Sequence, residues 1–193
     1  FADAGGGGAD LFAENYDGTS TKPSATGSNG IALGRLAVAS GNRSIAVGGG
    51  ATATGLFSTA LTNSYASGGD AFAAAISTGS SSYGATSANS IAIGENAKAT
   101  ATDSVAIGSG AYGNGNGAVA LGFNNESRSY AFTAGRESTA TGFVATAIGY
   151  NVGAYHDESV ALGRLTQTRV RSSIAFGSYG FGSSGDCQSG LYV

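Results

Sequence analysis

Hydrophobic and polar residues alternate along most of the chain in short segments that recur at a fixed spacing. The pattern is a small residue, an aliphatic residue, alanine, a second aliphatic residue and glycine, as in Ser44–Gly48. Alternation over four or five residues with β-branched side chains predicts β-strands. Nine copies, in three groups with a spacing of 14 residues inside each group, are centred on Ala32, Ala46, Ala60, Ala92, Ala106, Ala120, Ala147, Ala161 and Ala175.

A second, weaker alternating segment lies inside the period, for example Ala51–Gly55 and Ser138–Gly142. Glycine at the strand ends supplies the positive φ that tight corners need. Two strands and two corners in 14 residues do not suit regular hairpins. They predict an all-β fold in which each period is one flattened coil of a parallel β-solenoid and each strand pairs with its copy one period later. At about 4.8 Å per strand, eleven such turns would rise roughly 50 Å.

The spacing of the repeats is interrupted twice. The third and fourth central alanines are 32 residues apart, and the sixth and seventh are 27 apart. Each gap has room for one degenerate turn, for which Ala71–Ala75 and Tyr130–Thr133 are the candidates. We therefore expect about eleven turns within residues 29–182. We also expect irregular loops at Ser77–Ala88 and Phe123–Ser138, which would be the first places to look for a recognition surface.

The primary strand of each repeat has two different faces. Ile45 and Val47 point to one side, and Ser44, Ala46 and Gly48 point to the other. We expect the aliphatic side to fill the coil and the flat side of small residues to lie outside. A single thin coil buries little apolar surface, and repeat proteins need neighbours and caps. Parallel homotrimerisation that covers the flat side is the predicted remedy.

The two ends of the chain do not follow the period. Residues 1–28, which hold a glycine run and the only proline, are interpreted as a linker and an N-terminal cap over exposed strand edges. Docking to another surface component is the alternative. Residues 29–182 form the repeat region, and residues 183–193 form a C-terminal cap or a connection to a further domain. The chain contains no Met and begins at Phe1, so we expect it to be part of a longer polypeptide.

Composition and charge narrow the possible partners. Only 11% of the residues are charged and the net charge is −3, so there is no basic stripe for phosphate and nucleic-acid binding is not expected. No apolar run approaches the length of about 18 residues that a membrane span needs. The 34 glycines are interleaved with aliphatic residues at regular spacing, which argues against a disordered chain.

The residues that could carry chemistry are isolated. His156 stands beside Asp157 and Glu158, but neighbours on an extended segment point apart, so an exposed, inert histidine is favoured over a metal ligand. Cys187 has no second cysteine and no nearby histidine to activate it. Gly108–Gly113 matches a Gly-x-Gly-x-x-Gly string without a following helix. We predict no catalytic residue, no metal, no cofactor and no enzymatic activity.

Aromatic residues outside the repeat motif are the candidate receptor contacts, because aromatic side chains contact sugars and proteins well. Inter-chain packing and capping of the final turn are the alternative roles. The candidates are Tyr83, Tyr112, Phe123, Tyr130, Tyr150, Tyr155 and Tyr179.

Two further groups are interpreted as ordinary surface. Arg164, Arg169 and Arg171 are expected to form a solvated face paired with Asp157 and Glu158, although a trimer could arrange them as rings. Threonines in the weaker strands suggest an ice-binding ladder, but other residues interrupt the array, so this function is not favoured.

The Ser-[Ile/Val]-Ala-[Ile/Val]-Gly core with its 14-residue period resembles the head repeats of the YadA-like trimeric autotransporter adhesins, over residues 29–182. The resemblance implies a left-handed parallel β-roll, assembled as a parallel homotrimer in an extracellular fibre. Similar repeats occur in bacteriophage tail-fibre proteins, and Gly185–Val193 is similar to a segment that follows them there.

We therefore expect a rigid spacer and receptor-binding segment of a bacteriophage tail (virion) fibre. The head of a bacterial trimeric autotransporter adhesin, which binds host matrix or cells, is the alternative. The expected partners are copies of the chain itself, a host cell-surface glycan or protein, and other virion or surface fibre components.

Overall fold

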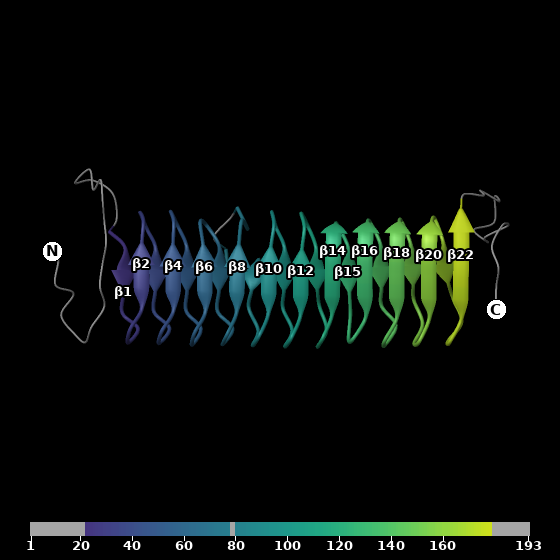
Figure 1. The fold of residues 1–193 in the computed structure, drawn as a ribbon, viewed down its shortest axis with the longest axis horizontal. Helices are drawn as coiled ribbons and strands as arrows, with labels where there is room; N and C mark the ends of the chain where they lie inside the picture. Colours follow the sequence, from purple (N-terminus) through teal and green to yellow (C-terminus); the bar gives the residue numbers. More distant parts are fainter. Residues whose placement is uncertain (1–21, 78–79, 179–193) are drawn as a thin grey trace.

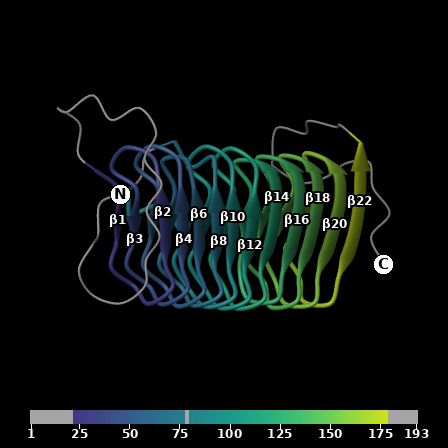
Figure 2. The same cartoon turned by 60° about the vertical axis from the view of Figure 1, so that its left-hand side comes forward.

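The computed structural model describes residues 22–77 and 80–178, which form a straight rod of stacked coils (Figure 1). Each coil gives one strand to each of two 11-stranded sheets, and neighbouring strands within a sheet are parallel. Figure 2 shows the coils lying one behind another along the rod. The predicted parallel β-solenoid of about eleven turns is confirmed.

The primary sheet is built from the strong repeat motifs. Its strands have three residues from β2 to β12 and five residues from β14 to β22. They are β2 (Ile31–Leu33), β4 (Ile45–Val47), β6 (Thr59–Leu61), β8 (Phe72–Ala74), β10 (Ile91–Ile93), β12 (Val105–Ile107), β14 (Val119–Phe123), β16 (Phe132–Arg136), β18 (Thr146–Tyr150), β20 (Val160–Arg164) and β22 (Ile174–Ser178).

The secondary sheet is built from the weaker motifs, with two residues in each strand. The first of its strands lies within the predicted N-terminal segment and pairs with the second. They are β1 (Ser24–Ala25), β3 (Val38–Ala39), β5 (Thr52–Ala53), β7 (Tyr65–Ala66), β9 (Gly84–Ala85), β11 (Lys98–Ala99), β13 (Tyr112–Gly113), β15 (Glu126–Ser127), β17 (Thr139–Ala140), β19 (Gly153–Ala154) and β21 (Gln167–Thr168).

Both predicted degenerate turns are present, as β8 and β16, and they pair in register with their neighbours. Nine residues separate β8 from β9 where four separate β4 from β5, so the extra residues of the longer gap lie there. The expected irregular loop at Phe123–Ser138 is wrong. This segment contains β15 and β16, which continue both sheets, and the missing residue is removed at the corner before β16.

The interior of the coil is filled by alanine, serine and other small residues, so the predicted orientation of the primary strand is wrong. Ala46 is fully buried, whereas Ile45 is 36% exposed and Val47 is half-buried. The same arrangement holds in β12, where Ala106 is buried and Ile107 is exposed. Short strands joined by tight corners bring the two sheets close together, so small side chains fill most of the space between them, and Thr133 is the largest residue at the central position of a primary strand. The aliphatic side chains are therefore on the outside.

Serine at the start of the motif closes the corner that precedes the strand. The hydroxyls of Ser90, Ser104 and Ser159 each donate a 2.6 Å hydrogen bond to the backbone carbonyl three residues earlier. A short hydroxyl side chain is suited to this local bond, which satisfies a carbonyl at the turn. This explains why the first position of the repeat is so often serine.

Glycine at the end of the motif is required where successive coils come into close contact. Gly149 has φ 139°, and a Cβ at this position would lie 1.7 Å from the carbonyl oxygen of Gly163 on the next coil. The positive φ and the close backbone approach both exclude other residues.

The orientation of the primary strand predicts different effects for a valine inside the coil and a valine on its outer surface. Ala106→Val adds two methyl groups to the closed interior and should lower the free energy of unfolding by about 1–3 kcal/mol. Thr139→Val, on the outward side of the secondary sheet, should change it by no more than about 0.5 kcal/mol. Urea denaturation of both variants measures the two changes, and equal destabilisation would contradict the assignment of the faces.

Candidate interaction surfaces

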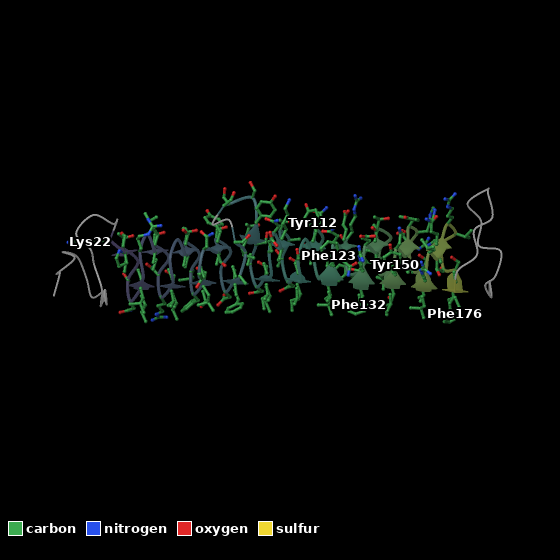
Figure 3. All side chains as sticks on the ribbon, turned by 90° about the horizontal axis from the view of Figure 1, so that it is seen from above. Lys22, Tyr112, Phe123, Phe132, Tyr150 and Phe176 are labelled. Carbon is green, nitrogen blue, oxygen red and sulfur yellow. The ribbon has the colours of Figure 1, made fainter. Side chains whose placement is uncertain are left out.

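The outward side of the primary sheet is a continuous apolar surface, which we call the aliphatic face. It consists of the first and third residues of each primary strand, which are half-buried or exposed in the single chain; Ile31 is 46% exposed and Phe176 is 48% exposed. Figure 3 shows Phe132 and Phe176 pointing away from the rod on this side. A contiguous apolar surface of this length is typical of a protein interaction site. Its further apolar members include Leu33, Ile45, Val47, Leu61, Phe72, Ile91, Ile93, Val105, Ile107, Val119, Leu121, Ile148, Val160, Leu162 and Ile174.

The secondary sheet carries an aromatic cluster centred on a lysine. The ammonium of Lys98 lies 4.6 Å from the ring centroid of Tyr83 and 5.6 Å from that of Tyr112, within the range of cation–π attraction. Tyr112 is half-buried on the outer side of β13, opposite the aliphatic face (Figure 3). Tyr83 precedes β9 and packs against the buried alanines. We call these three residues the lysine cluster.

Aromatic and arginine side chains alternate along the edge where the primary strands end. Phe123, Arg136, Tyr150 and Arg164 are paired in register through β14, β16, β18 and β20. The Arg136 guanidinium lies 5.5 Å from the Phe123 ring centroid and 5.4 Å from that of Tyr150, and Arg164 lies 5.6 Å from Tyr150. Figure 3 looks down on this edge. We call these four residues the end ladder.

The opposite edge, where the primary strands begin, carries a separate apolar group. Tyr130 is 57% exposed and its ring meets that of Phe143 edge-on, with centroids 5.5 Å apart and planes at 73°. Val144, beside Phe143, is also exposed. We call Tyr130, Phe143 and Val144 the start patch.

The predicted contact residues therefore occupy several surfaces and do not form one site. Tyr155, which follows β19, is exposed on the side of the secondary sheet. Tyr179 lies outside the described residues, as do Cys187 and the predicted C-terminal segment at 183–193.

Sequence reasoning missed four residues that complete these groups, namely Lys98, Arg136, Phe143 and Val144. A signal for Arg136 was present, because every member of the end ladder directly follows the glycine of its motif. Extending the alignment of the repeats by one position would have found the ladder. No comparable signal pointed to Phe143, because its contact with Tyr130 depends on how the corners of adjacent coils stack.

The three arginines of the predicted basic face make different contacts and do not act as one group. Arg171 lies 3.3 Å from the carboxylate of Glu158, which confirms one expected pairing. Arg164 belongs to the end ladder, and Arg169 donates to the Gln167 side chain at 3.1 Å. His156 is exposed, and in residues 22–77 and 80–178 no three His, Cys, Asp or Glu side chains are grouped so that they could hold a metal ion.

The Glu158 carboxylate is held in its charged form by two neighbours. The Ser172 hydroxyl donates a 2.7 Å hydrogen bond to it, and the Arg171 guanidinium lies beside it. The hydrogen bond and the positive charge lower the pKa of Glu158 below its ordinary value. These contacts connect the last two described corners on the start edge.

Fold and surfaces together define a parallel β-solenoid with an outward aliphatic face. The family described as the YadA head domain repeat (2 copies) matches residues 25–51, 39–61, 85–111 and 140–166. These segments of the chain are similar to YadA head domain repeats, which supports the resemblance to the YadA-like family. No curated protein matches the chain. Among the described residues there is no helix that is long and apolar enough to cross a membrane.

The lowered pKa of Glu158 gives a pH prediction with a definite sign. The folded protein binds this proton more weakly than the unfolded chain, so the contacts stabilise the fold above the ordinary pKa of a glutamate. This stabilisation is lost as the pH falls through the lowered pKa. Between neutral pH and about pH 3, Tm should fall more for the wild type than for Glu158→Gln.

Ser172→Ala is the control, because it removes the hydrogen bond and should move the pKa of Glu158 back toward its ordinary value. NMR titration of the Glu158 carboxyl carbon measures this shift directly. The same pH dependence of Tm in the wild type and in Glu158→Gln would show that these contacts do not couple protonation to stability.

Proposed function

We propose that this chain is a non-catalytic segment of an extracellular homotrimeric fibre, acting as a rigid spacer with an adhesive surface. The single observation that carries the proposal is the aliphatic face, which runs the length of the rod and is open in the isolated chain. Apolar surface of this extent favours association with other chains. The similarity to YadA head repeats, whose family forms homotrimers, supports three copies in parallel.

In the proposed trimer the three primary sheets face the fibre axis and the three secondary sheets face outward. This orientation reverses the expectation from the sequence, in which the small-residue face was to be covered. The rows of Ile, Leu, Val and Phe would then form the central core that the thin coils lack. One face of each primary strand would thus lie in the interior of its own coil, and the other face would lie in the core between the three chains.

Ile107→Asp tests the role of the aliphatic face. A symmetric trimer would bring three unpaired carboxylates into an apolar interface, so we expect the loss of the trimer. Thr139→Asp, on the outward side of the secondary sheet, is the matched control and should remain trimeric. Sedimentation equilibrium should give three times the 18.7 kDa chain mass for the wild type and the control. A stable, folded wild-type monomer would overturn the proposal.

The lysine cluster is the proposed adhesive site, because it lies on the sheet that the trimer leaves exposed. Tyr83 and Tyr112 offer aromatic faces, and Lys98 between them offers a positive charge and hydrogen-bond donors. Aromatic faces pack on sugar rings or apolar side chains, while the ammonium pairs with an acidic group. The proposed receptor is a host cell-surface glycan or protein.

Two settings remain for the fibre. We propose a bacteriophage tail fibre that joins other virion components, on the strength of the C-terminal sequence Gly185–Val193, which is similar to segments that follow such repeats in phage proteins. The match to YadA head repeats itself favours the second candidate, the head of a bacterial trimeric autotransporter adhesin.

Binding assays test the adhesive site and the setting together. The labelled trimer is presented to bacterial cells and to host extracellular-matrix proteins; binding to bacteria supports the phage fibre, and binding to matrix supports the adhesin. Combining Lys98→Gln with Tyr112→Ala should weaken that binding roughly tenfold or more. Thr139→Ala, farther along the same column of the secondary sheet, is the control and should leave the binding unchanged. Full binding by the double variant would place the adhesive site elsewhere.

The non-catalytic role is tested by incubating the purified protein with host polysaccharide. Release of oligosaccharides would overturn that role.

A further inference from the structure

The two edges of the primary sheet carry complementary side chains in the same coils. Tyr130 lies two residues before β16, which ends at Arg136. Phe143 and Val144 precede β18, which ends at Tyr150. The start patch and the central part of the end ladder therefore lie at the same height along the rod, on opposite edges.

Side chains of the start patch and of the end ladder are exposed and can contact a partner chain. Tyr130, Phe143 and Val144 are all exposed although their contacts include an aromatic pair. Val144 also keeps a φ of 56°, which is unfavourable for a β-branched residue. On the other edge, Arg136 is bound to Glu137 at 3.2 Å and stacks between two rings, and its side chain is still 59% exposed.

The geometry of a closed trimer brings these edges together. This step rests on the proposed function, in which the primary sheets face the axis. The strands run perpendicular to the rod axis (Figure 1), so in such a trimer they run around the axis in one direction. The end of each primary strand then points toward the beginning of the same strand in the next chain. Cyclic symmetry makes this contact heterologous and keeps it at one height.

We infer that the start patch of each chain packs on the end ladder of its neighbour. Tyr130 and Phe143 of one chain then contact Arg136 and Tyr150 of the next, which extends the aromatic–arginine stacking across the interface. Arginine and aromatic rings are the residues most enriched at the energetic centres of protein interfaces. The partner is thus a second copy of this chain, and the contact occurs three times around the fibre.

This contact would fix the vertical register of the chains. The aliphatic face repeats with every coil, so sliding one chain by one coil, about 4.8 Å, preserves most of its apolar contacts. Register is weakly specified in such a uniform surface. The positions equivalent to the end ladder in the first three coils are Arg35, Gly49 and Asn63, which contain no aromatic residue. A slide of one coil places an aromatic ring where arginine stood opposite the start patch, or the reverse, and a slide of three coils moves the start patch off the end ladder altogether.

Cysteine cross-linking between the edges tests the inference in the full chain. In a Cys187→Ser background, Phe143→Cys is combined with Tyr150→Cys and treated with a bis-maleimide shorter than β18. The five residues of β18 span roughly 16 Å at about 3.3 Å per residue, so the reagent can join these positions only between chains. We expect covalently closed trimers on a denaturing gel.

Two controls test whether cross-linking depends on the height along the rod and on the pairing of unlike edges. Phe143→Cys with Arg35→Cys keeps the same two edges but separates the heights by eight coils, roughly 38 Å at about 4.8 Å each, and should not cross-link. Each single cysteine variant alone should also give no cross-link, because like edges do not meet.

The mass of the same variants by sedimentation separates the possible outcomes. Trimeric mass with the cross-link only in the Phe143–Tyr150 pair supports the inference. Trimeric mass without that cross-link, or with equal cross-linking of the single variants, overturns the edge contact and leaves the trimer standing. A folded monomer overturns both the edge contact and the proposed function.

Discussion

The distance between the two sheets is the constraint on which the rest of this structure depends. Each coil closes through tight corners, so the two sheets lie close together, and the central position of the primary strand is alanine in every described coil except that of β16, where Thr133 is buried. Ala46, Ala106 and their equivalents are fully buried for this reason. Serine hydroxyls close the corners, and glycine permits the contact between coils at positions such as Gly149. The small residues of the repeat motif are therefore those that fit this narrow interior.

A narrow interior forces the larger apolar side chains to the outside. Burial of methyl groups alone provides little stabilisation per coil, since the hydrophobic contribution scales with the apolar area removed from water. The aliphatic face holds the apolar area that the interior cannot accommodate, and it becomes stabilising only when another chain covers it. In the proposed fibre, the folding of the coil and the association of the chains are therefore linked by the same geometric restriction.

The sequence was sufficient for the fold but not for the placement of its faces. Strand alternation and the spacing of Ala32, Ala46 and the later alanines are local signals, so the period, the parallel pairing and both degenerate turns could be predicted. Which face lies inside depends on the separation of the sheets, and both faces carry residues that tolerate burial. The end ladder lies one position beyond the five-residue motif, at the ends of the paired strands. The contact of Tyr130 with Phe143 arises from the stacking of corners, which the motif does not describe.

The most direct test of this account is the chemical accessibility of the two sides of one coil. Single cysteines at Ile107, on the aliphatic face, and at Tyr112, on the secondary sheet, are compared in a Cys187→Ser background by their rates of maleimide labelling. The account predicts that the cysteine at 107 is protected in the native assembly and reacts once the chains are dissociated, while the cysteine at 112 reacts at once. Equal, rapid labelling of both cysteines in the native protein would contradict it.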